Sequence, residues 1–167
     1  ARKGFEITNN LDEAEVVLIN TCGFIGDAKE ESIQAILEVA EKKKMGNLKK
    51  IIVAGCLAQR YADELIAEIP EIDAVVGTGE IHKIEEIVDT ILEDSKIVKC
   101  DSFEFLADAG TERILTTNPH TAYLKIAEGC NRRCTYCIIP QLRGELRSRR
   151  IEDIVEEAKT LAANGVR

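Results

Sequence analysis

Three short, continuous apolar runs constrain the fold more than any other feature of the sequence. They occupy residues 16–19, 51–54 and 74–76, and each is rich in Val or Ile. Runs of this length and composition predict β-strands that are buried on both faces. Apolar residues at helical spacing follow each run, over residues 33–40, 57–69 and 81–92. Strands that alternate with helices in this way predict an α/β fold with a parallel sheet.

Two cysteines come directly after the first two expected strands. Cys22 and Cys56 hold equivalent places, each between a strand and the helix that follows it. Ligands of parallel sheets bind along the carboxyl edge of the strands, so the two thiols can face one site. Packing is the alternative, because cysteine is often a buried residue. The spacing alone does not decide between a ligand role and packing for Cys22 and Cys56. We interpret Cys100, which follows the apolar residues 97–98, as structural.

Three further thiols lie within eight residues, as Cys130, Cys134 and Cys137 in the spacing C-x3-C-x2-C. One loop can bring them onto three corners of a single inorganic group. Closed zinc sites need four protein ligands, and an open position is typical of a site that performs chemistry. Thiolates suit zinc or an iron–sulfur cluster, and the incomplete set favours the cluster. A zinc site completed by upstream His120 is the alternative.

The periodicity indicates a division of the chain into two domains. It fades after residue 93, and we expect an N-terminal domain at 1–93, a linker at 94–118 and the beginning of a second domain at 119–167. Residues 122–127 predict a strand that leads into the cysteine loop. A helical stripe from Ile151 to Ala162 predicts a helix, with Ser148 as its N-cap and Asn164-Gly165 as its C-terminal cap.

Charge and composition exclude several classes of function. The formal net charge of −8 argues against a general nucleic-acid-binding protein, although residues 119–150 carry seven Lys or Arg against Glu128 and Glu145. No apolar run has the length of a membrane-spanning helix, so we expect no membrane partner. Six cysteines in a chain rich in helix and strand signals fit free thiols in a reducing cytoplasm better than disulfides. No Ser/His/Asp or paired-carboxylate arrangement indicates hydrolysis.

The cysteine loop, with an aromatic residue before its last cysteine, resembles that of the radical S-adenosylmethionine enzymes. The resemblance implies that Cys130, Cys134 and Cys137 bind three irons of a 4Fe-4S cluster, while S-adenosylmethionine chelates the fourth. It also implies that Tyr136 lies in the cofactor-binding region. In this family the reduced cluster cleaves S-adenosylmethionine to a radical that removes hydrogen from the substrate.

The segments at residues 20–25 and 55–60 resemble the N-terminal domain of one branch of that family, the methylthiotransferases. The resemblance implies a flavodoxin-like or Rossmann-like parallel-sheet domain, followed by the start of a radical S-adenosylmethionine partial TIM barrel. It also implies a second, auxiliary 4Fe-4S cluster, with Cys22 and Cys56 as two of its three ligands. The remaining ligand is expected upstream of Ala1. We therefore expect a piece of a longer protein that does not turn over alone.

Residues 121–130 and 139–144 resemble the methylthiotransferases that modify a ribosomal protein. The resemblance implies transfer of a thiomethyl group to the β-carbon of an aspartate in small-subunit ribosomal protein twelve. A one-electron reductant is the other expected partner, and RNA contact through a region beyond Arg167 stays open. A tRNA adenosine methylthiotransferase is the alternative enzyme. A non-enzymatic zinc-binding module is the alternative from a different class.

Overall fold

The computed structural model describes residues 4–46, 48–93, 95–111, 113, 115 and 118–167. These residues form two compact units, Ala1–Glu104 and Phe105–Arg167, which we call the first and second unit. Residues 94, 112, 114, 116 and 117 of the expected linker lie outside the described residues. The domain limits of 93 and 119 stay a prediction. No helix in the described ranges is long and apolar enough to cross a membrane.

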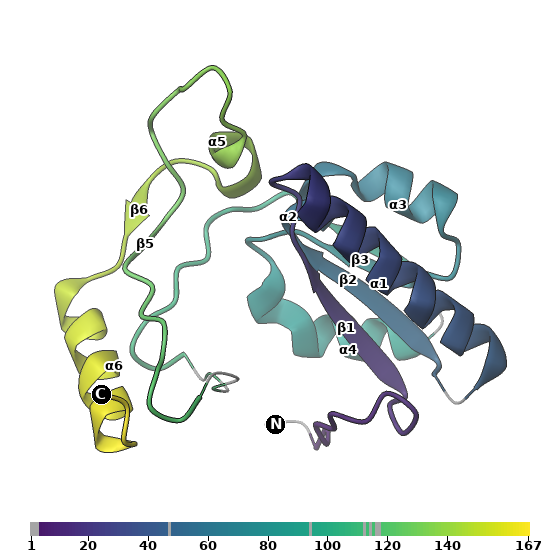
Figure 1. The fold of residues 1–167 in the computed structure, drawn as a ribbon, viewed down its shortest axis with the longest axis horizontal. Coiled ribbons are helices and arrows are strands. Elements are labelled where there is room, and N and C mark those ends of the chain that lie inside the picture. The colour runs from purple at the N-terminus through teal and green to yellow at the C-terminus, as the bar shows by residue number, and fades with distance from the viewer. Residues whose placement is uncertain (1–3, 47, 94, 112, 114, 116–117) are drawn as a thin grey trace. The chain divides into compact units, whose positions relative to one another are not determined.

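The first unit is built on a four-stranded parallel sheet, which confirms the predicted α/β fold (Figure 1). The strands follow one another in the order β1-β2-β3-β4. They are β1 (Val16–Thr21), β2 (Lys50–Gly55), β3 (Ala74–Val76) and β4 (Ile97–Lys99). The register pairs Val16 with Lys50 and Thr21 with Gly55, so β1 and β2 end level with each other at their carboxyl ends.

Helices cover both faces of this sheet, with α1 and α4 on opposite sides (Figure 1). Because side chains alternate along a strand, Ile51 and Val53 of β2 face one layer and Ile52 and Ala54 face the other. The first layer contains α1 (Gly26–Met45), α2 (Cys56–Arg60) and α3 (Ala62–Glu68), and the second contains α4 (Ile84–Leu92). The middle strand is therefore buried on both faces, as its continuous apolar run predicts.

The helix predicted at residues 57–69 is two helices. Tyr61 leaves the helical region at φ −130° and ψ 37°, and it separates α2 from α3. Leu57 of α2 and Leu65 of α3 are both buried in the same core layer. The bend thus lets two short helices share one apolar layer. The predicted helix at 81–92 begins as a short 3-10 helix, Ile81–Lys83, before α4.

The second unit contains β5 (Ala127–Glu128), α5 (Ile139–Arg143), β6 (Arg147–Ser148) and α6 (Ile151–Ala163). The strand predicted at 122–127 was mostly wrong, because only Ala127 of that range is in β5 and β5 pairs antiparallel with β6. Tyr123 and Ile126 are 79% and 61% exposed, so packing does not hold that segment as a strand.

The helix predicted from Ile151 is confirmed as α6. Its N-cap residue is Arg150 and not Ser148, because Ser148 pairs within β6. The predicted C-terminal cap is confirmed, with Asn164 at the cap and Gly165 at φ 93°. Such a left-handed conformation after a helix favours glycine.

Candidate functional sites

The first candidate site lies at the carboxyl edge of the sheet. Thr21 and Gly55 are register partners at the ends of β1 and β2, so Cys22 and Cys56 follow from neighbouring positions. Cys22 is exposed and Cys56 is half-buried, and neither is in a disulfide. The structure thus brings together the two thiols that the sequence places at equivalent strand ends.

Two glycines allow these strand ends to pack backbone to backbone. A β-carbon at Gly23 would lie 2.8 Å from the carbonyl oxygen of Cys56, which is too close for any larger residue without movement. A β-carbon at Gly55 would lie 2.5 Å from the carbonyl oxygen of Thr21, and Gly55 has φ 101°. Each cysteine therefore has a neighbouring glycine that the close approach requires. The sequence shows both glycines but not the contacts they permit.

Ser32 of α1 holds the backbone of Cys22 in place. The Cys22 N–H donates to the Ser32 hydroxyl at 3.1 Å, and that hydroxyl lies 2.7 Å from the carbonyl oxygen of Ala28, to which it donates. The Thr21 hydroxyl donates to the carbonyl oxygen of Ala54 at 2.6 Å, in a buried bond between β1 and β2. These bonds fix the loop backbone from both sides and leave the Cys22 thiol exposed.

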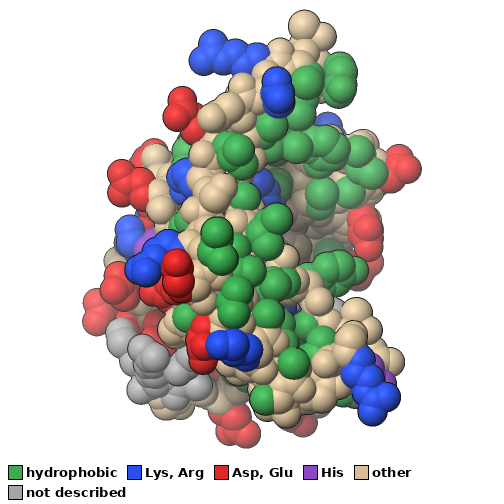
Figure 2. Space-filling model, turned by 90° about the vertical axis from the view of Figure 1, so that its left-hand side faces the viewer, with side chains coloured by type: hydrophobic (Ala, Val, Ile, Leu, Met, Phe, Trp, Pro, Cys, Tyr) green, Lys and Arg blue, Asp and Glu red, His purple; other side chains and the backbone are tan. Residues whose placement is uncertain are grey.

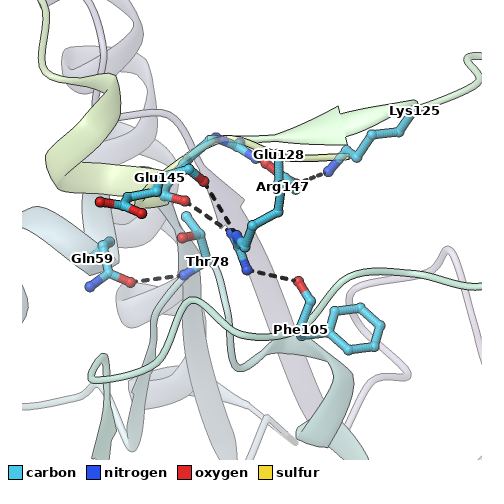
Figure 3. A network of polar contacts seen from close by, with 8 residues as sticks. Gln59, Thr78, Phe105, Lys125, Glu128, Glu145 and Arg147 are labelled. Atoms are coloured by element: carbon cyan, nitrogen blue, oxygen red, sulfur yellow. Dashed lines mark hydrogen bonds and ion pairs between the residues drawn. The ribbon is translucent and has the colours of Figure 1, made fainter. Parts of the chain in front are cut away.

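Cys100 has a different environment from Cys22 and Cys56. Its sulfur lies 3.7 Å from the carbonyl oxygen of Ala58, and the side chain packs against the apolar core. Burial raises the pKa of the Cys100 thiol to about 11. Gln59 links the residues around Cys100 to Thr78. Its side-chain amide donates to the carbonyl oxygen of Cys100. Its side-chain oxygen accepts the N–H of Thr78 (Figure 3). These contacts agree with a structural interpretation of Cys100.

The second candidate site is the cysteine loop, residues 130–137. The Cys137 N–H donates to the carbonyl oxygen of Cys134 at 3.0 Å, which closes a turn between these two thiols. The Cys130 N–H donates to the carbonyl oxygen of Gly144 at 3.1 Å, and the Arg132 N–H lies 3.4 Å from the Cys130 sulfur. All three cysteines are free, and Tyr136 in the turn is 90% exposed.

Polar contacts within the second unit anchor the segments on either side of this loop. Glu128 of β5 pairs with Lys125 (Figure 3). Glu128 also pairs with Arg143 of α5 at 2.9 Å. Burial raises the pKa of the Glu128 carboxyl, but the bonds to Lys125 and Arg143 outweigh it and lower the pKa. The Arg147 guanidinium donates to the carbonyl oxygens of Glu145 at 3.4 Å and Phe105 at 3.5 Å. The segments before and after the loop are therefore both held by polar contacts within the second unit.

Asn131 adds a contact that motif reasoning did not identify. Its side-chain oxygen accepts the N–H of Leu146 at 2.8 Å, and this bond joins the start of the loop to the segment before β6. The chemical signal in the sequence is only that an amide stands between Cys130 and the two arginines, which does not reveal a partner fifteen residues away.

The donor set fits an iron–sulfur cluster. Three free thiols project from one loop, and a backbone N–H directed at the Cys130 sulfur is the kind of hydrogen bond that stabilises a metal-bound thiolate. Among the described residues, no group of three or more His, Cys, Asp or Glu side chains is gathered to hold a metal ion, and this applies to the three loop thiols with or without His120.

Two families of known proteins match different parts of the chain. Residues 1–77 match the family described as "Uncharacterized protein family UPF0004", and residues 124–167 match the "Radical SAM superfamily". The second match defines the class, in which S-adenosylmethionine and an iron–sulfur cluster are the cofactors. With a cysteine-bearing sheet domain before that loop, the chain is similar over 99% of its length to methylthiotransferases.

Relatives from several bacteria carry one name, "Ribosomal protein uS12 methylthiotransferase RimO". The protein of Clostridioides difficile is 53% identical over 99% of this chain, and that of Pelotomaculum thermopropionicum is 54% identical over 99%. The protein of a Thermoanaerobacter species is 50% identical over 99% of the chain. The chain spans about 37% of the length of the first two relatives and 38% of the third.

Proposed function

We propose that the protein transfers a thiomethyl group to the β-carbon of an aspartate in ribosomal protein uS12. The observation that carries the proposal is the pairing of two thiols at the sheet edge with a separate loop of three thiols. Identity of about 50% to proteins named as uS12 methylthiotransferases supports the ribosomal protein over tRNA as substrate.

In this proposal, Cys130, Cys134 and Cys137 hold a 4Fe-4S cluster and leave one iron for S-adenosylmethionine. When bound, these cofactors supply the one-electron chemistry that produces a carbon radical on the substrate. The turn from Cys134 to Cys137 spaces two ligands, and the Arg132 N–H stabilises the thiolate of Cys130. We assign the contact with S-adenosylmethionine in this loop to Tyr136, which is exposed in the turn.

Cys22 and Cys56 are proposed as two ligands of a second 4Fe-4S cluster, with a third ligand from outside this chain. The support is their neighbouring places at the ends of β1 and β2 and the glycine contacts that hold them there. A division at 1–93, 94–118 and 119–167 would separate sulfur delivery from radical formation. The remaining partner is a one-electron reductant. The proposed compartment is the cytoplasm, which free thiols and a ribosomal substrate support.

The test uses the full-length protein that contains this chain, prepared without oxygen. We expect a thiomethyl mass gain on one aspartate of uS12 and no modified adenosine in digested tRNA incubated in parallel. Modified tRNA with unmodified uS12 would reverse the choice of substrate. Zinc without iron or sulfide in the purified protein would contradict the enzyme and leave the zinc module.

A further inference from the structure

The cysteine loop carries two basic side chains that set it apart from the rest of the second unit. Arg132 and Arg133 stand between Cys130 and Cys134, and both are exposed. Figure 2 shows Lys or Arg side chains at the top of the view, at the height where Figure 1 draws the loop between β5 and α5. These charges lie on a chain whose formal net charge is −8.

The other Lys and Arg side chains of residues 119–150 have partners inside the second unit. Their partners are Glu128 for Lys125 and Arg143, the Arg143 carbonyl oxygen for Arg147, Glu157 for Arg149 and Glu152 for Arg150. Within the described ranges, neither Arg132 nor Arg133 has an ion pair or a side-chain hydrogen bond of this kind. Among the described residues from 119 to 150, the guanidinium groups without such a partner are therefore those of Arg132 and Arg133, beside the thiols.

The backbone of Arg132 also contacts Cys130, one of the proposed cluster ligands. Its backbone N–H lies 3.4 Å from the Cys130 sulfur, while its side chain is exposed. A partner that binds the Arg132 guanidinium is thus separated from the sulfur by one residue and one hydrogen bond.

We propose that Arg132 and Arg133 form the docking surface for an acidic one-electron carrier protein. This inference rests on the proposed function, which requires a reductant, and it names the site and the charge of that partner. One electron leaves the reduced flavin or iron–sulfur group of the carrier and reduces the oxidised loop cluster by one electron, with no bond made or broken. Opposite charges speed such encounters and orient them.

Charge also separates this partner from the other candidates. A ribosomal protein binds RNA phosphates and is correspondingly basic, so two arginines would repel it. RNA binding takes several phosphate contacts, more than two guanidinium groups supply. An acidic carrier matches the sign of the loop and needs only a small, transient interface.

The test uses the full-length protein with purified oxidised flavodoxin as the probe. At low salt, the double variant Arg132→Gln/Arg133→Gln should bind flavodoxin about tenfold more weakly, with a flatter dependence on salt. Arg132→Lys/Arg133→Lys should bind within about twofold of wild type, because it keeps both charges. Lys159→Gln, which removes an exposed charge from α6, is the matched control and should bind as wild type.

A second readout separates this inference from the proposed function. Cleavage of S-adenosylmethionine should fall far more in the Gln variant when reduced flavodoxin supplies electrons than when dithionite does. Equal affinity in wild type and the Gln variant, equal losses with both reductants, or a loss of RNA binding in place of flavodoxin binding would overturn the docking surface. Absence of cleavage by wild type with dithionite would instead contradict the proposed function.

Discussion

Gly23 and Cys56 lie so close that a β-carbon at residue 23 would be 2.8 Å from the carbonyl oxygen of Cys56. This contact joins the loop after β1 to the start of α2, and it sets the separation of Cys22 from Cys56. We expect Gly23→Ala to force the two loops apart. The free energy of unfolding should fall by about 1–3 kcal/mol, since overpacking of rigid backbone costs this much.

Gly23→Ala should also change the separation of the Cys22 and Cys56 thiols, so the iron bound by the full-length protein should fall. Gly26→Ala is the matched control, because a β-carbon at Gly26 meets nothing within 4 Å. Urea unfolding and iron analysis of both variants check the prediction. Wild-type stability in Gly23→Ala would show that the loops relax freely.

The thiols of the first unit should differ in their roles. Cys22→Ala or Cys56→Ala should lower the iron content of the full-length protein by about half and remove thiomethyl product, while 5'-deoxyadenosine is still formed. Cys100→Ala should change neither, because that side chain packs against the core. A loss of iron in Cys100→Ala equal to that in Cys22→Ala would contradict this assignment.

The central part of the fold follows from the sequence, and its irregular parts do not. The run from Ile51 to Ala54 predicts a doubly buried strand because burial on both faces excludes polar side chains. The bend at Tyr61 cannot be predicted from hydrophobic periodicity, since the same apolar stripe fits one straight helix or two short helices joined by a bend. Ile126 is apolar and strand-forming, yet a strand also needs a paired neighbour, and pairing is a long-range property.

Motifs in the sequence single out the five cysteines of the two candidate sites, whereas the surroundings of these cysteines are seen only in the structure. The carboxyl-edge rule placed Cys22 near Cys56, and the register confirms that neighbourhood. The roles of Ser32 and Asn131 depend on partners ten and fifteen residues away. Hydrogen bonds at that separation leave no periodic signal in a single sequence.

Arg149 and Glu157 should make the second unit sensitive to acid. The Arg149 side chain is 2% exposed and pairs with Glu157 at 2.5 Å, and Arg113 pairs with the same carboxylate at 2.6 Å. Burial raises the pKa of Glu157, but the bonds from Arg113 and Arg149 outweigh it and lower the pKa below its ordinary 4.5. Stability from this group is therefore present above pH 4.5 and lost as pH falls through the lowered pKa.

Glu157→Gln removes the charge that compensates buried Arg149. We expect a loss of about 3 kcal/mol in the free energy of unfolding at neutral pH, with a smaller loss in acid, where wild type is also protonated. Arg113→Gln should cost about 1 kcal/mol or less, because Arg113 is more exposed. Urea unfolding of the three proteins across the acid range checks this. Parallel stability curves for wild type and Glu157→Gln would refute it.

Asn131 should act as a positioning residue for the loop cluster. Its side-chain oxygen accepts the Leu146 N–H at 2.8 Å, so Asn131→Ala frees the start of the loop without removing a ligand. Loss of such a supporting bond typically weakens metal binding about 10–100-fold. We expect cluster loss to a chelator to become faster by about tenfold, with 5'-deoxyadenosine production lowered but present.

The acceptor and not the amide is what this position requires, so Asn131→Asp should retain the cluster nearly as well as wild type. Complete loss of S-adenosylmethionine cleavage is expected when a proposed ligand itself is removed, as in Cys130→Ala, Cys134→Ala or Cys137→Ala. Chelator-induced bleaching followed by absorbance separates the three behaviours. If Asn131→Ala bleaches at the wild-type rate, the bond to Leu146 does not hold the loop, and the anchoring must come from the Cys130 contact with Gly144.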